Sequence, residues 1–165
     1  MLIMNPYARF IEDRDPLQVI GTTYPKLLKL VKGLTPRQIT KAPAAGKWSI
    51  QEIVAHLADC ELVFTVRCRW IAFEDSPQLV PFDQDKWANG RVREKEPFAA
   101  TLERFRVLRQ AQVRFAKSLS KVDLARTGLH LERGQVSLGE TLETCAGHDI
   151  NHLQQIEAIR KKLLG

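Results

Sequence analysis

The sequence predicts an all-α protein, a four-helix bundle folded as one domain over residues 1–165. Four long segments repeat apolar side chains at every third or fourth position, which is the period of an amphipathic helix. Two of these segments follow a Ser-x-x-Glu capping box, a pattern that opens helices. No low-complexity stretch or linker divides the chain, and its 165 residues are enough for one core.

The first long helix is expected to begin at Asp15 and Pro16, an N-cap followed by proline at the first helical position. Apolar residues then recur with a helical period over residues 17–31. Pro25 lies inside this segment and is expected to kink it, because proline lacks the N–H that an inner turn uses. Gly33 ends it.

A short helical turn is predicted over residues 35–40, and a loop over 41–47. The second long helix follows the capping box formed by Ser49 and Glu52, and it is expected to reach about Phe73. Residues 83–90 have the pattern of one further helical turn.

The third long helix is expected to begin at Pro97 and to place its apolar residues on one face as far as Leu119. Residues 123–135 contain two glycines and weak strand character, so they predict a long connection with a short hairpin. Ser137 to Glu140 is the second capping box, and it opens a last helix that reaches about Leu163.

Composition restricts the class of protein. The net charge is +6, but residues 91–96 alternate in sign and predict a solvated face rather than a nucleic-acid surface. Three cysteines without a CxxC motif indicate reduced thiols and a cytoplasmic location. The first residues do not resemble a signal peptide, and no run of 18 apolar residues predicts a membrane span.

Histidines are the most informative residues of the chain. His148 and His152 are four residues apart on an apolar helical stripe, so both rings lie on one face and can chelate a single ion. A lone inward histidine such as His56 is more often a hydrogen-bonded core residue, and the pair can also arise by chance. If His56 joins the pair, three nitrogen ligands leave an open position, as in catalytic zinc sites.

Other polar residues flank these histidines. Asp59 and Asp149 are the catalytic candidates, because either carboxylate can orient an imidazole or accept a proton. The alternative for both is an ordinary surface or capping charge. Cys60 and Cys145 are expected to pack in the core rather than to bind the ion, and His130 is expected to be exposed in its loop.

Three segments resemble the DinB/YfiT-like superfamily: GKWSIQEIVAHLAD at 46–59, FDQDKWA at 82–88 and HDINHLQQI at 148–156. The resemblance extends over about residues 17–163. It implies a bundle of mostly down-up-up-down connectivity and one divalent ion per chain, often nickel or zinc. Carried over by position, its ligands are His56, His148 and His152. The resemblance also implies a metal-dependent hydrolase and a frequent homodimer.

The leading hypothesis is therefore a cytoplasmic metal-dependent hydrolase that activates water on a three-histidine ion and acts on a small-molecule substrate. The same ion would serve an S-transferase or isomerase that uses a low-molecular-weight thiol, with Arg67 and Arg69 as candidates for binding the thiol's carboxylates. A non-catalytic metal-binding protein of a stress response is a third possibility, so enzymatic activity stays open. Nucleic-acid binding through residues 104–117 is disfavoured, because that face has no recognition motif.

Overall fold

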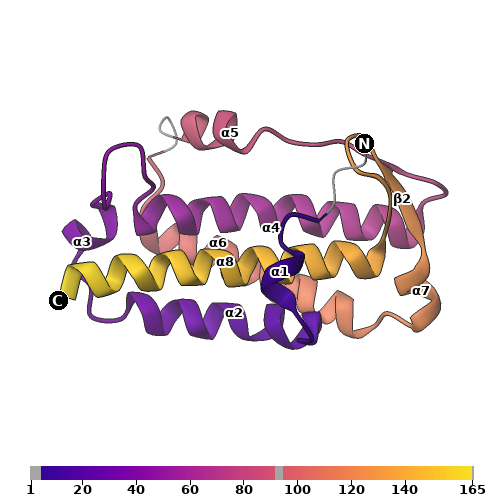
Figure 1. The fold of residues 1–165 in the computed structure, drawn as a ribbon, viewed down its shortest axis with the longest axis horizontal. Coiled ribbons are helices and arrows are strands. Elements are labelled where there is room, and N and C mark those ends of the chain that lie inside the picture. Colours follow the sequence, from indigo (N-terminus) through magenta and orange to yellow (C-terminus); the bar gives the residue numbers. More distant parts are fainter. Residues whose placement is uncertain (1–4, 92–94, 165) are drawn as a thin grey trace.

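The computed structural model describes residues 5–91 and 95–164, and four long helices run along its longest dimension (Figure 1). Around the bundle the order is α2, α8, α4 and α6. Helices α4 and α6 run in one direction, while α2 and α8 run in the other (Figure 1). The predicted four-helix bundle is confirmed. The four helices are α2 (Pro16–Val31), α4 (Ile50–Phe73), α6 (Phe98–Lys117) and α8 (Leu138–Leu164).

The N-cap and the two capping boxes that the sequence predicts are present at the starts of these helices. The Asp15 carboxylate accepts a hydrogen bond from the N–H of Leu17 at 3.0 Å. In the first capping box, Glu52 accepts from the N–H of Ser49 at 2.7 Å, and Ser49 Oγ accepts from the N–H of Glu52 at 3.3 Å. The box at the start of α8 has the same two bonds, at 2.6 and 3.1 Å. Each bond satisfies an N–H group that a helix start leaves without an intrahelical partner.

The described residues also form four short helices, and three of them lie between long ones. Two coincide with predicted helical turns, α3 (Pro36–Thr40) and α5 (Gln84–Arg91), whereas α1 (Ala8–Ile11) and α7 (Lys121–Ala125) were not predicted. Because α4 and α6 are parallel neighbours, the chain must return along the bundle between them, and α5 lies along the outside of α4 on this path (Figure 1).

A small sheet covers one end of the bundle. The predicted hairpin exists as β2 (Thr127–His130) and β3 (Gly134–Ser137), which pair antiparallel. A strand that was not predicted, β1 (Gln78–Leu79), pairs parallel to β2 and places Leu79 opposite His130. The sheet order is β1-β2-β3.

The core consists of two apolar clusters separated by a polar layer. One cluster lies toward the sheet and includes Ile20, Phe64 and Leu142, and the other lies toward the far end and includes Leu27, Leu57 and Ile156. Buried polar residues lie on all four long helices at or near the point in the sequence where one cluster ends and the other begins: Thr23, His56, Asp59, Glu61, Arg109, Gln112, His148, Asp149 and His152.

All three cysteines are buried and free of disulfides. Within the described part of the chain, no helix has the length and apolarity needed to cross a membrane.

Candidate metal centre

Two imidazoles meet in the polar layer. His56 lies in the second turn of α4 and His148 in the middle of α8, and their Nε2 atoms are 3.0 Å apart. Both side chains are buried, at 1% and 3% exposure. The contact follows from the antiparallel packing of α4 against α8, which brings an early turn of one helix beside a middle turn of the other.

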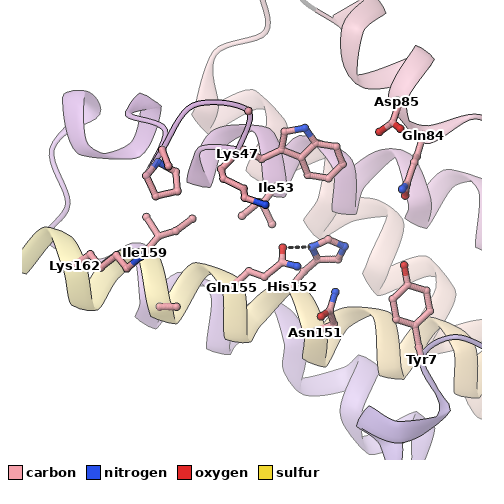
Figure 2. Close-up of a pocket in the computed structure, with 15 residues that line it drawn as sticks. Tyr7, Lys47, Ile53, Gln84, Asp85, Asn151, His152, Gln155, Ile159 and Lys162 are labelled. Atoms are coloured by element: carbon pink, nitrogen blue, oxygen red, sulfur yellow. Dashed lines mark hydrogen bonds between the residues drawn. The ribbon is translucent and has the colours of Figure 1, made fainter.

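His152 lies one turn beyond His148 on the same face of α8. Its ring centroid is 4.4 Å from that of His148 and 4.8 Å from that of His56. On its outer side, His152 Nδ1 lies 3.0 Å from Gln155 Oε1, an oxygen that can only accept (Figure 2). Nδ1 therefore carries the proton, and Nε2 keeps a free electron pair for a ligand bond.

Cys60 is the other donor at this place, one turn after His56 on α4. Its Sγ atom lies 3.4 Å from His56 Nε2. Donor atoms of His56, Cys60 and His148 all lie within 4.8 Å of one another, so this buried group can hold a metal ion. The structure thus brings a thiol to a place where sequence reasoning expected only core packing.

The electrostatics favour neutral imidazoles. Burial lowers the pKa of His148 well below its usual range, and positive charge on His152, His56 or Arg109 would lower it further. Burial also lowers the pKa of His152. A neutral ring offers the lone pair that a metal requires, so these histidines need lose no proton on binding near pH 7.

The spacing of the donor atoms fits a metal ion. Around a tetrahedral zinc with Zn–N bonds of about 2.0–2.1 Å, two nitrogen ligands lie roughly 3.3 Å apart. The 3.0 Å between the Nε2 atoms of His56 and His148 is close to this value.

Aromatic rings enclose the three histidines. The Trp48 ring lies 4.9 Å from His56, Tyr7 meets His148 edge-on at 5.1 Å, and Phe64 lies 6.0 Å from His148, all between ring centroids. Such rings exclude water and lower the local dielectric, which strengthens charge interactions inside the site.

A cavity of about 720 Å³ opens beside His152 (Figure 2). Tyr7, Trp48 and Ile53 line it together with the polar side chains of Asn151 and Gln155. Lys47 and Lys162 also line it, as do Gln84 and Asp85 of α5. His152 is therefore the histidine through which a small molecule in the cavity would approach the metal centre.

The carboxylate of Asp149 belongs to a buried charge cluster rather than to the cavity lining. Arg109 Nη1 donates to Asp149 Oδ2 and, at 3.1 Å, to the carbonyl of Ile20. Arg109 Nη2 donates to Asp149 Oδ1 at 3.1 Å and to Glu61 Oε2 at 2.7 Å. Thr23 donates to Asp149 Oδ2 at 2.6 Å. The cluster joins all four long helices beside His148.

The cluster holds two carboxylates against one guanidinium. Burial raises the pKa of Glu61 despite the opposing charge of Arg109. The pKa of Arg109 is raised because the two carboxylates outweigh the effect of burial. Asp59 lies apart from this group, and its Oδ1 accepts from Arg104 at 3.0 Å.

Sequence reasoning missed the two aromatic walls. These walls are Trp48, which directly precedes the capping box of α4, and Tyr7, which comes from the N-terminal segment. The available signal for Tyr7 was Gly147, a glycine inside a long helix, which costs about 1 kcal/mol relative to alanine and so suggests a packing reason. A Cβ at Gly147 would overlap the Tyr7 carbonyl oxygen and lie 2.9 Å from Tyr7 Cβ.

The remaining candidate residues lie away from the three histidines. The prediction that His130 is exposed was wrong, because strand pairing in β2 buries it to 7% exposure. Arg69 donates to Gln112 at 3.1 Å and lies over the Phe115 ring, so it packs against α6. Cys145 is fully buried, and its Sγ lies 3.8 Å from Arg109 Nη2 rather than among the histidines.

Comparison with known proteins supports the same family. The chain is 27% identical over 162 residues to a protein of Oceanobacillus iheyensis named "putative metal-dependent hydrolase", covering 98% of this chain and 88% of the relative. A Bacillus cereus protein of that name is 28% identical over 138 residues, covering 84% and 79%.

The solved structure of YfiT from Bacillus subtilis is described as "a probable metal-dependent hydrolase with an unusual four-helix bundle topology". It superposes with a TM-score of 0.82 at 20% identity, covering 90% of this chain and 85% of YfiT. At this identity the likeness establishes the shared fold. The profile of the DinB superfamily matches residues 20–156, and the chain therefore belongs to the DinB superfamily.

Proposed function

We propose that this protein is a metal-dependent hydrolase whose divalent ion is bound by His56, His148 and His152. The observation that carries the proposal is the approach of two buried Nε2 atoms to 3.0 Å, with the third ring beside a cavity. The names of the relatives from Oceanobacillus and Bacillus support hydrolysis. Imidazole ligands suit zinc or nickel.

When bound, such an ion would polarise a carbonyl or phosphoryl oxygen and make water a better nucleophile near neutral pH. The residues of the chain supply the rest. Gln155 fixes the tautomer of His152, and Trp48 and Tyr7 keep bulk water from the histidines.

Asp59 and Asp149 remain the candidates for proton transfer. Both oxygens of Asp149 accept hydrogen bonds inside the buried cluster, which supports a role in positioning the turn of α8 that carries His148. Asp59 lies one turn after His56 and pairs with the partly exposed Arg104, so an Asp59→Asn variant is the more direct test of a proton acceptor.

Metal content tests the ligand set. We expect the purified protein to bind one zinc or nickel ion per chain, measured by inductively coupled plasma mass spectrometry after dialysis. His148→Ala and His152→Ala should lose the ion, whereas Asn151→Ala, on the same helix, should keep it. Full metal occupancy in His152→Ala would refute the three-histidine site.

Cys60 provides the competing ligand. With Co²⁺ as a probe, a bound thiolate adds a charge-transfer band in the near ultraviolet, and we expect none. If Cys60→Ser loses the metal and His152→Ala keeps it, the group His56, Cys60 and His148 replaces the proposed one.

Hydrolysis is tested by a panel of ester, amide and phosphoester substrates, with Cys60→Ser and His148→Ala compared in each assay. Metal-dependent turnover that His148→Ala abolishes is the expected result. Stable metal binding without turnover on any substrate would instead favour the non-catalytic metal-binding protein.

A second candidate is an S-transferase or isomerase that uses a low-molecular-weight thiol. The cavity favours it specifically, because Lys47, Lys162, Asn151 and Gln155 can bind the carboxylates and amides of such a thiol. A rate that requires both the metal and an added thiol would support this reaction over hydrolysis. A cytoplasmic homodimer is part of the same proposal, and size-exclusion chromatography with light scattering tests the dimer.

A further inference from the structure

Two arginines near the sheet, Arg67 and Arg133, have no carboxylate partner among the described residues, unlike two arginines of α6. Arg104 and Arg109 each pair with two carboxylates. Among the residues described, neither Arg67 nor Arg133 has a carboxylate oxygen within the 4.0 Å of an ion pair. Both side chains are nevertheless half-buried, where an uncompensated charge is costly.

The fold brings Arg67 to the sheet. It lies on α4, and its Nη2 donates to the carbonyl of Val80 at 2.6 Å. Val80 directly follows Leu79, which lies opposite His130 in the register of β1 and β2. The guanidinium of Arg67 is thus bound to the residue that directly follows the strand paired with the buried His130.

Arg133 comes to the same place from the turn between β2 and β3. Its backbone N–H donates to the carbonyl of His130 at 3.2 Å. Its Nη1 lies 3.5 Å from Thr144 Oγ1 on α8, which is a long contact for a guanidinium donor. Arg67, His130 and Arg133 therefore come from α4, β2 and the hairpin turn, and they converge beside α8.

Donors in this cluster are left unused. The Nε atoms of Arg67 and Arg133 are buried, and no described residue forms a hydrogen bond with either of them. His130 Nδ1 accepts from the N–H of Glu132 at 3.3 Å, so the neutral ring carries its proton on Nε2 and can donate. Buried polar atoms without partners are rare in native proteins, and some of them mark the place where an ion binds.

The charges are also unbalanced. Burial and the charge of Arg133 lower the pKa of Arg67, and burial with both arginines lowers the pKa of His130. Two acidic groups face the cluster, Glu132 and Glu140, and the second already accepts the capping N–H of Ser137.

We propose that Arg67, Arg133 and His130 form a binding site for an oxyanion group, either a phosphate or a carboxylate. The planar guanidinium matches the geometry of such groups, and an anion would supply the partners that both Nε atoms lack.

The site lies near the metal centre along both helices. Arg67 follows Cys60 by seven residues on α4, about 10 Å along the helix, and Thr144 precedes His148 by one turn on α8, about 6 Å. A substrate that carries such an anionic group would have to span this distance to place its reacting end at the histidines. This last step rests on the proposed function, whereas the anion site itself does not.

Isothermal titration calorimetry with inorganic phosphate, phenyl phosphate and benzoate tests the site on the chelator-treated full chain at constant ionic strength. We expect wild type to bind at least one of them, and Arg133→Gln to bind it at least tenfold more weakly. Lys121→Gln, which removes one exposed charge at the same end of the bundle, should match wild type. No binding by wild type, or equal binding by Arg133→Gln, would overturn the proposal.

Two further comparisons make the result specific. Arg133→Lys keeps the positive charge but loses the planar guanidinium. The variant, with its fold checked by circular dichroism, should therefore also bind the anion more weakly than wild type. An affinity equal to that of wild type would count against the site. Tighter binding of phenyl phosphate than of phosphate supports a substrate-borne group, and the reverse order supports a free anion. Phosphate binding that survives in a His148→Ala chain without metal would uphold the site even if the proposed hydrolase fails.

Discussion

Replacing Arg109 by methionine is the sharpest test of the polar layer. The arginine is 3% exposed and donates to two carboxylates and one carbonyl, so its removal leaves Glu61 and Asp149 as neighbouring buried negative charges. Removing one partner of a buried ion pair costs about 3–5 kcal/mol, and methionine keeps most of the volume. For a chain of this length, that loss lowers the melting temperature by roughly 6–20 °C.

Urea unfolding followed by circular dichroism measures the loss, on chelator-treated protein so that metal affinity does not contribute. The matched control is Arg106→Met on the same helix. Arg106 is 34% exposed and pairs with Glu103, and solvent-exposed pairs of this kind contribute little to stability. If Arg109→Met loses no more stability than Arg106→Met, the buried cluster does not hold the helices together as argued.

A combined variant separates charge from packing. Arg109→Met with Glu61→Gln and Asp149→Asn removes all three ionisable groups. Because the single change leaves uncompensated charge and the triple change does not, the triple variant should be more stable than Arg109→Met. A triple variant that is less stable would assign the effect to lost hydrogen bonds and packing.

Three further results are expected. In chelator-treated protein, the free energy of unfolding should decrease from about pH 7 to pH 5, by up to about 1.4 kcal/mol per pH unit for each of His148 and His152. The reason is that imidazoles of the unfolded chain take up protons near pH 6.5, whereas burial keeps these two neutral in the folded chain. A free energy of unfolding, measured in urea, that does not change over this pH range would contradict the expectation. Gly147→Ala should release the segment around Tyr7, detected as faster proteolysis there, whereas Gly139→Ala, with its nearest contact at 3.5 Å, should not. Burial raises the pKa of Cys68 to about 12, so a thiol reagent at pH 8 should not modify it in the folded chain but should in urea.

The helices were predictable because their signals are local. Ser49 with Glu52, and Ser137 with Glu140, form their capping boxes within four residues of chain. The pairing of β1 with β2 joins segments about 50 residues apart, and nothing in the short β1 sequence indicates its partner. The burial of His130 depends on that pairing, which explains why it was mistaken for an exposed residue.

In the third long helix, a charged residue is buried although its charge favours an exposed position. From the sequence alone, residues 104–117 are interpreted as one charged face, yet Arg109 in this range follows the buried Phe105 by four residues and lies on the same face of the helix. The charge of Arg109 favours an exposed position, whereas its spacing from Phe105 favours a buried one. The buried position is the one observed, because Glu61 and Asp149 on other helices lie opposite the guanidinium and neutralise its charge. A single sequence gives no sign of these partners, so the cluster could not be found without the fold.

The order of the chain has a consequence for synthesis. His148, His152 and Asp149 all lie in the last helix, which packs on both α2 and α4. A ribosome would thus release this helix after the other three have emerged, and until then Arg109 and Glu61 face each other without Asp149. The docking of this last helix therefore completes the proposed set of donors and brings Asp149 to Arg109 in the same late step of folding.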